Sequence, residues 1–126
     1  MTEEVGRYME KADHALRVAE RLAQDGFAPD AASKVYYAMF YEAQALLKAE
    51  GIDVVKHSAV ESAFGHRFAK PGKIDPKYHR MLIDARRIRE IADYDILEEV
   101  VDPVASLKVE EGREFLNEIK RLLSLF

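Results

Sequence analysis

The amino-acid sequence predicts an all-α protein, built as an up-and-down bundle of four to five antiparallel helices. Apolar residues recur at spacings of three and four through most of the chain, which is the pattern of amphipathic helices. Glycine and proline residues divide the chain into segments of helical length. No segment shows sustained alternation of apolar and polar residues, and the nearest approach is the short run at residues 52–55. Short connections between consecutive helices favour antiparallel neighbours.

The first two helices are predicted at residues 3–24 and 29–49. In the first, the apolar spacing ends near Gly26, a residue that commonly terminates helices. In the second, Pro29 stands in the first turn, where proline is tolerated because its missing N–H has no helical partner there. Gly51 follows the second helix at the place where a left-handed C-cap is needed.

Three further helices are predicted after residue 57. Each begins at a residue type that favours a helix start. The third runs from Ser58, as its N-cap, through Phe68, and is ended by the breaker KPGK. In the other two, an aspartate caps and a proline occupies the first turn: Asp75-Pro76 begins a helix that reaches Ala92 or Tyr94, and Asp102-Pro103 begins one that runs toward Leu123.

Length and composition narrow the classes of protein. A chain of 126 residues fits one domain, so we expect a single helical domain over residues 1–126. It has 19 Lys and Arg against 23 Asp and Glu, a net charge of −4, so any contact with RNA needs a local basic patch. Cysteine is absent, which excludes disulfides and thiolate metal sites. The N-terminal segment resembles neither a signal peptide nor a membrane span, and we expect a cytoplasmic protein that does not contact membranes.

Four aromatic residues lie close together in the segment SKVYYAMFYEAQALL. Helical spacing puts Tyr36 and Phe40 on the apolar side that faces the core. Tyr37 and Tyr41 fall on the polar side, together with Ser33. These two tyrosines either pack beneath the first or third helix or form an outer surface for a second copy of the chain or a nucleotide.

Arg89 lies within the apolar sector of the fourth predicted helix. An arginine there must reach a partner or water, because an unpaired buried charge is strongly unfavourable. Asp93, one turn later, is its nearest candidate partner, and Arg86 lies on the same strip of the helix. Two interpretations remain open: a helix-surface ion pair, or a positioned guanidinium that binds phosphate while Asp93 or a tyrosine orients it or transfers a proton.

Four segments in this order resemble a HEPN domain, the higher-eukaryote and prokaryote nucleotide-binding family: ASKVYYAMFYEAQALL, KHSAVESAF, GKIDP and RIREIADYD. The resemblance is to its small single-domain prokaryotic branch and covers nearly the whole chain. It implies a helical bundle that forms a homodimer and is often encoded beside a minimal nucleotidyltransferase as a toxin and antitoxin pair. Many members are metal-independent ribonucleases in which an arginine and a histidine, separated in the sequence by four to six residues, are brought together across the dimer.

Arg89 matches the arginine of this pattern, but the histidine is missing. The corresponding positions hold Tyr94, Asp95 and Ile96. A tyrosine with an ordinary pKa of about 10 is protonated at neutral pH and is a poor general base. The resemblance therefore implies a protein that binds nucleotide, RNA or a nucleotidyltransferase through Arg89, Asp93 and Tyr94. A ribonuclease that uses the same three residues is the alternative, and a structural adaptor is the second alternative.

Two further roles are expected by analogy or by position. In some related toxins a tyrosine near this motif is adenylylated by the partner, and Tyr94 is the matching position. His57, near the start of the third helix, is the best candidate for an imidazole from elsewhere in the chain. We group His57 with Ser33, Tyr37, Tyr41 and Arg86 as binding or interface residues. No histidine pair has zinc-site spacing and no glycine-rich phosphate loop is present, so we expect no metal and no cofactor.

Overall fold

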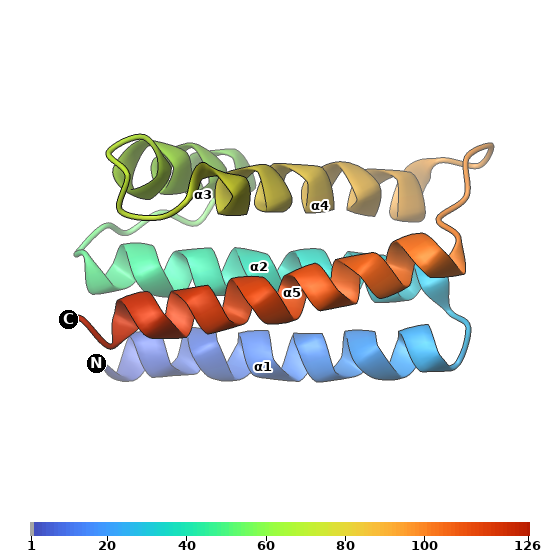
Figure 1. The fold of residues 1–126 in the computed structure, drawn as a ribbon, viewed down its shortest axis with the longest axis horizontal. Coiled ribbons are helices and arrows are strands. Elements are labelled where there is room, and N and C mark those ends of the chain that lie inside the picture. Colours follow the sequence, from blue (N-terminus) through green and yellow to red (C-terminus); the bar gives the residue numbers. More distant parts are fainter. Residues whose placement is uncertain (1) are drawn as a thin grey trace.

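The computed structural model describes residues 2–126, and this part of the chain folds into helices without any strand (Figure 1). Five α-helices and one π-helical turn follow one another: α1 (Glu3–Gln24), α2 (Ala28–Ala49), α3 (His57–Phe64), η1 (Gly65–Ala69), α4 (Pro76–Tyr94) and α5 (Asp102–Leu123). The four long helices alternate in direction along the bundle (Figure 1). The predicted all-α, up-and-down bundle is therefore confirmed.

Helices α1 and α2 begin and end where the sequence predicts. Thr2 caps α1, because its side-chain oxygen accepts a hydrogen bond from the N–H of Val5 at 3.3 Å. Gly26 and Gly51 follow the two helices with φ of 84° and 82°, the left-handed region that glycine adopts without strain. Pro29 lies in the first turn of α2 as predicted.

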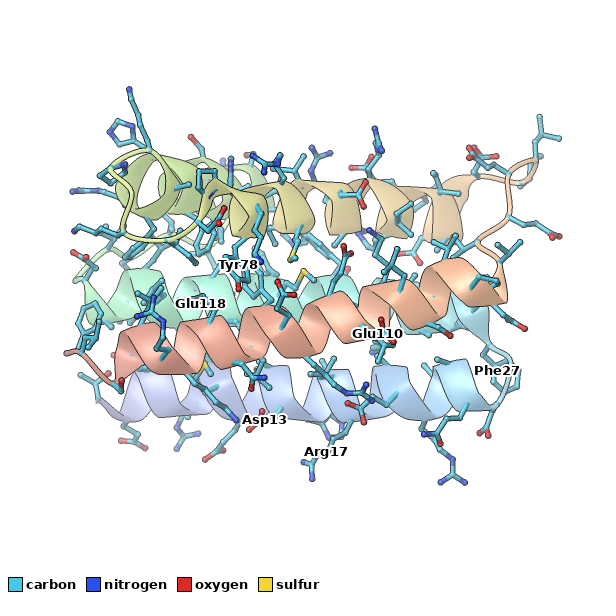
Figure 2. The ribbon with its side chains drawn as sticks, in the orientation of Figure 1. Asp13, Arg17, Phe27, Tyr78, Glu110 and Glu118 are labelled. Carbon is cyan, nitrogen blue, oxygen red and sulfur yellow. The ribbon has the colours of Figure 1, made fainter. Side chains whose placement is uncertain are left out.

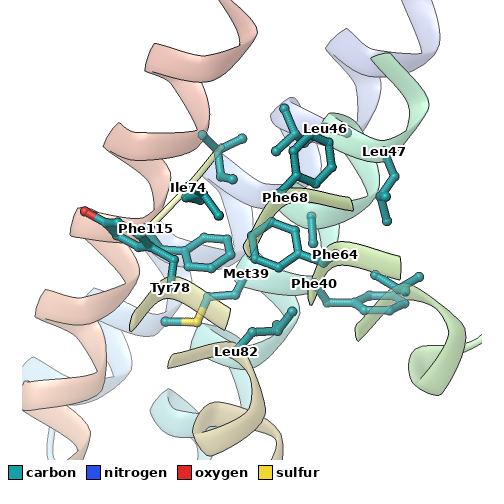
Figure 3. Close-up of a cluster of buried hydrophobic side chains, with 14 of the residues drawn as sticks. Met39, Phe40, Leu46, Leu47, Phe64, Phe68, Ile74, Tyr78, Leu82 and Phe115 are labelled. Carbon is teal, nitrogen blue, oxygen red and sulfur yellow. The ribbon is translucent and has the colours of Figure 1, made fainter. Parts of the chain in front are cut away.

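Helix α2 lies at the centre of the bundle and packs against α1, α3, α4 and α5. The predicted core residues Tyr36 and Phe40 are both buried in this helix. Figure 3 shows the aromatic part of the core, where the rings of Phe64 and Phe115 lie 5.6 Å apart between α3 and α5. Polar side chains such as Arg17 point away from the bundle (Figure 2). No helix in the described part of the chain has the length and apolar character of a membrane span.

The third helix differs from its prediction in its N-cap and in the conformation of its last turn. Its N-cap is Lys56, whose backbone is extended, so Ser58 already lies inside the first turn and does not cap the helix. From Gly65 to Ala69 the helix continues as the π-helical turn η1, which ends one residue beyond the predicted end at Phe68. A Cβ at Gly65 would lie 2.6 Å from atoms of the His79 ring, so only glycine allows α4 to approach this closely. The same ring contacts the carbonyl oxygen of Glu61 at 3.1 Å.

The start of α4 is as predicted, but the start of α5 is not. A side-chain oxygen of Asp75 accepts a hydrogen bond from the N–H of Lys77 at 2.9 Å, which caps α4. Val101 is the N-cap of α5, and its extended backbone leaves Asp102 as the first helical residue. Asp102 therefore acts through its negative charge at the helix N-terminus and not as a cap.

One carboxylic acid is enclosed in the core. Glu42 of α2 has no exposed surface. Neither of its carboxyl oxygens has a hydrogen-bond partner within residues 2–126. Burial raises the pKa of Glu42 well above its usual value; Asp13 of α1 raises it further, and Lys120 of α5 opposes the change. The folded protein therefore favours the protonated, uncharged form of this side chain.

Candidate functional site

The guanidinium of Arg89 lies between α4 and α2 among three aromatic rings. Its side chain is 12% exposed. The central carbon of the guanidinium is 5.2 Å from the ring centre of Tyr36, 5.7 Å from that of Tyr37 and 5.9 Å from that of Tyr94. Cations at such distances from aromatic rings are attracted by the ring electrons. One turn of α2 and the end of α4 therefore fix the position of this charge.

Asp93 is the carboxylate nearest to this charge, as its spacing predicts. One guanidinium nitrogen of Arg89 is 3.6 Å from a carboxylate oxygen of Asp93, which is too long for a hydrogen bond. The hydroxyl of Ser33 donates to the same oxygen at 3.4 Å, so α2 also holds Asp93. The Nε of Arg89 is buried and has no hydrogen-bond partner within residues 2–126. The guanidinium is thus held in place with part of its hydrogen-bonding capacity unused.

A second network surrounds Glu61, a buried carboxylate of α3. Arg86 of α4 donates to one of its oxygens at 2.7 Å, and the hydroxyl of Tyr36 donates to the other at 3.3 Å. Burial, followed by the charge of Glu61, raises the pKa of Tyr36 above its ordinary value. The hydrogen bonds to Glu61 and Glu90 raise the pKa of Arg86. Arg86 therefore stays charged and Tyr36 stays protonated throughout the physiological pH range.

His57 is connected to this network through Tyr36. Its Nδ1 lies 2.9 Å from the hydroxyl oxygen of Tyr36. Because that hydroxyl has one proton and donates it to Glu61, both contacts are satisfied when Nδ1 of His57 carries a hydrogen. The imidazole also packs on Phe40, with ring centres 4.3 Å apart, and meets the ring of Tyr37 edge to face. These contacts hold the imidazole in one orientation.

A groove of about 650 Å³ between α3 and α4 joins the two networks. Charged and titratable side chains line it: His57, Glu61, His79, Arg86, Arg89 and Glu90. The predicted residues His57, Arg86 and Arg89 are therefore brought to one surface. Tyr94 lies beyond this groove and is 74% exposed. No group of three or more potential ligands in the described part of the chain is arranged to hold a metal ion.

Tyr37 and Tyr41 are half-buried, which lies between the two alternatives predicted for them. Tyr37 contacts both His57 of α3 and Arg89 of α4. Tyr41 is directed toward α1, where the amino group of Lys11 lies 5.4 Å from its ring centre. Each ring therefore packs against a neighbouring helix and also borders a surface groove between α1 and α2.

Two residues of the site, Tyr36 and Glu61, are not among the site residues predicted from the sequence. The burial of Tyr36 is predicted, but its hydroxyl contacts to His57 and Glu61 are not. Glu61 carries a recognisable signal, because it stands three residues before the buried Phe64 in an apolar strip. A carboxylate on the buried face of a helix needs a partner, as Arg89 does on α4.

Comparison with known proteins finds one matching family and several similar proteins. The sequence model of the family described as HEPN domain matches residues 5–126. Two proteins of Methanocaldococcus jannaschii, both named "Putative toxin", are 34% identical over 120 residues and 31% identical over 121 residues. These alignments cover 95% and 96% of this chain and 82% and 90% of the two relatives. A protein of Gloeobacter violaceus named as a UPF0332 protein is 39% identical over 94 residues, or 75% of each chain.

Proposed function

The chain belongs to the HEPN domain family, and on that premise we propose that it acts as a dimeric binding protein in a toxin–antitoxin-like system. Its ligand is a nucleotide or RNA, or a minimal nucleotidyltransferase partner, bound through Arg89, Asp93 and Tyr94. The names of the two archaeal relatives support the toxin–antitoxin setting. The fixed position of the Arg89 guanidinium supports the binding role.

The state of Arg89 is the observation that carries this proposal. Three rings hold the guanidinium, yet its Nε has no partner and its contact with Asp93 is 3.6 Å long. A buried donor without a partner costs about 1–3 kcal/mol, so the guanidinium is not fully satisfied in the free protein. A guanidinium binds phosphate through two parallel hydrogen bonds, and these bonds are stronger where water is largely excluded. Arg89 is therefore prepared for an anion.

A ribonuclease is the second candidate, and one observation favours it. His57 lines the same groove as Arg89, so an imidazole is present although none follows Arg89 in the sequence. In that case, His57 takes the proton of an RNA 2′-hydroxyl as its oxygen attacks the neighbouring phosphorus, the bond from phosphorus to the 5′-oxygen breaks, and the 5′-oxygen takes a proton from solvent. Arg89 stabilises the negative charge that develops on the attacked phosphate. Tyr36 and Glu61 orient the imidazole. The binding role remains our first proposal, because the histidine that the resemblance places after Arg89 is absent.

RNA cleavage and RNA binding by the same samples test the two candidates. We compare wild type with Arg89→Ala, in the presence of a metal chelator and with light scattering on each sample. Loss of charge-assisted hydrogen bonds of about 1.5–3 kcal/mol is expected to lower the affinity for a labelled RNA roughly 10- to 150-fold. Arg87→Ala is the matched control, since Arg87 is an exposed arginine of the same helix.

The outcomes separate the candidates. Binding that depends on Arg89, with no cleavage by either protein, supports the binding role. If wild type cleaves RNA and Arg89→Ala does not, and both proteins have the same oligomeric state, the protein is a ribonuclease and the binding role is rejected. Equal RNA and nucleotide binding by wild type and Arg89→Ala would contradict both.

A further inference from the structure

A basic groove of about 620 Å³ runs between α1 and α2. Tyr37 and Tyr41 form part of its wall. Its cationic and titratable lining residues are Arg7, Lys11, His14 and Lys34, and Glu10 is the acidic residue among those that line it. Neither Lys11 nor Lys34 forms an ion pair with a carboxylate within residues 2–126, whereas Arg7 pairs with Glu3. The groove thus offers unpaired ammonium groups beside aromatic rings.

Part of the acidic charge of the chain lies in a segment outside this groove. Residues 93–107 contain five acidic residues and no lysine or arginine. Without these five, the 23 acidic residues of the chain fall to 18, against 19 basic residues, so the remainder carries a charge of +1. Three of the five, Asp95, Glu98 and Glu99, lie in the connection between α4 and α5 at one end of the bundle (Figure 1). Helices α1 and α2 themselves contain six basic and seven acidic residues, and one of the seven, Glu42, is buried, so their surface is close to neutral.

A continuous series of contacts links this groove to Arg89. The guanidinium of Arg89 lies 5.7 Å from the ring centre of Tyr37. The ring centres of Tyr37 and Tyr41 are 6.5 Å apart, and the amino group of Lys11 lies 5.4 Å from that of Tyr41. We call these four residues the ladder. It has a cation at each end and two aromatic rings between them, so a single nucleotide can occupy only part of it.

We propose that the ladder and the basic groove bind single-stranded RNA of several nucleotides, with phosphates at Arg89, Lys11 and Lys34 and bases on the two tyrosine rings. Aromatic rings in a basic groove bind single strands with little sequence preference, because every base has a stacking face. The inference rests on the proposed function, since Arg89 ends the ladder, and it narrows the ligand from a nucleotide to a strand. It also assigns to α1 a role that the sequence does not predict.

Fluorescence anisotropy with a labelled single-stranded RNA of about eight nucleotides tests this proposal. The test variant is the double substitution Lys11→Ala and Lys34→Ala. The control is Lys70→Ala with Arg80→Ala, which removes the same charge from two exposed residues outside the groove. Loss of two phosphate contacts is expected to reduce the slope of log affinity against log salt by about 1.4, because each contact on a single strand contributes about 0.7. The control is expected to leave the slope near that of wild type.

The aromatic part of the ladder has its own matched pair of variants. Tyr41→Leu is expected to weaken RNA binding roughly 5- to 150-fold, the loss expected when one base loses its stacking partner. Tyr41→Phe keeps the ring and is expected to bind close to wild type. The affinity of wild type is also expected to rise steeply from a nucleoside monophosphate to the longer RNA, because only the strand reaches both ends of the ladder.

Three results would overturn the proposal, and they leave the proposed function distinguishable. If the groove and control variants have the same salt slope while Arg89→Ala loses binding, the ligand contacts Arg89 alone and the proposed function stands. If Tyr41→Leu dissociates a dimer in light scattering without changing RNA affinity, a second copy of the chain occupies the groove. If wild type binds no oligonucleotide, the ligand is not a strand. The proposed function is then tested by comparing the binding of a nucleoside monophosphate to wild type and to Arg89→Ala.

Discussion

Replacing the enclosed carboxylic acid of α2 by an apolar side chain is expected to stabilise the protein. In Glu42→Met a side chain of similar length loses the two carboxyl oxygens that lack hydrogen-bond partners in the core. A buried polar group without a partner costs about 1–3 kcal/mol, so the free energy of unfolding is expected to rise by about that amount in mild acid. Imperfect packing of the thioether reduces the gain, since volume-conserving swaps usually cost less than about 1.5 kcal/mol.

The same substitution is expected to change how stability depends on pH. The pKa of Glu42 is raised on folding, so below the unfolded pKa of about 4.3 the side chain is neutral in both states and makes no pH-dependent contribution. As pH rises between the unfolded and folded pKa values, ionisation favours the unfolded chain, and wild type loses up to about 1.4 kcal/mol per pH unit relative to Glu42→Met. The advantage of the variant is therefore larger at pH 7 than at pH 5.

Urea unfolding followed by helical circular dichroism measures both effects. The free energies of wild type, Glu42→Met and Glu42→Gln are compared at pH 5 and pH 7, with the denaturant dependence checked for equality. Glu42→Gln keeps the shape and does not titrate, so it isolates the pH-dependent part. A difference between wild type and Glu42→Gln that is the same at both pH values would refute the reasoning, because it would mean that folding does not raise the pKa of this carboxyl.

Three other predictions concern the site and its support. Glu61→Gln is expected to lower the free energy of unfolding by about 1.5–3 kcal/mol in urea titrations, because hydrogen bonds to a charged group are lost; no change would show that the buried network does not stabilise the fold. Gly65→Ala is expected to destabilise by about 1–3 kcal/mol, and adding His79→Ala is expected to recover part of this in a double-mutant cycle; strictly additive effects would argue against the contact. If a partner nucleotidyltransferase modifies Tyr94, intact mass spectrometry detects adenylylation of wild type and Tyr41→Phe but not of Tyr94→Phe, and modification of all three would exclude this position.

The helices could be predicted from the sequence because their signals are local. Pro29, Gly51 and Asp75 act within one turn of their own positions, and the structure agrees with all three. The π-helical turn η1 has no such signal, because it lies where Gly65 meets the ring of His79, a residue of another helix. The prediction that Ser58 caps the third helix is wrong, because the N-cap is the residue whose backbone is extended, which is Lys56. The sequence around Ser58 does not determine which residue that is.

The candidate site likewise contains contacts that the sequence predicts and contacts that it does not. The pairing of Arg89 with Asp93 follows from a spacing of four on one helix. The pairing of Glu61 with Arg86 joins α3 to α4, so no spacing within one segment reveals it. Tyr36 is predicted as core from its place on the helix, but helical periodicity states only that a ring points inward and not which polar group meets its hydroxyl.

The central position of α2 has a consequence for the dynamics and the divergence of this protein. Because α2 contacts α1, α3, α4 and α5, its amide hydrogens are expected to exchange with solvent only when the whole bundle opens, and those of α3 through smaller openings. Ser33, Tyr36 and Tyr37 belong to this slowest-exchanging helix, so they cannot be rearranged without disturbing the part of the molecule that all other helices share. Among related chains, we expect ligand preference to diverge through α1, α3 and α4, while α2 changes least.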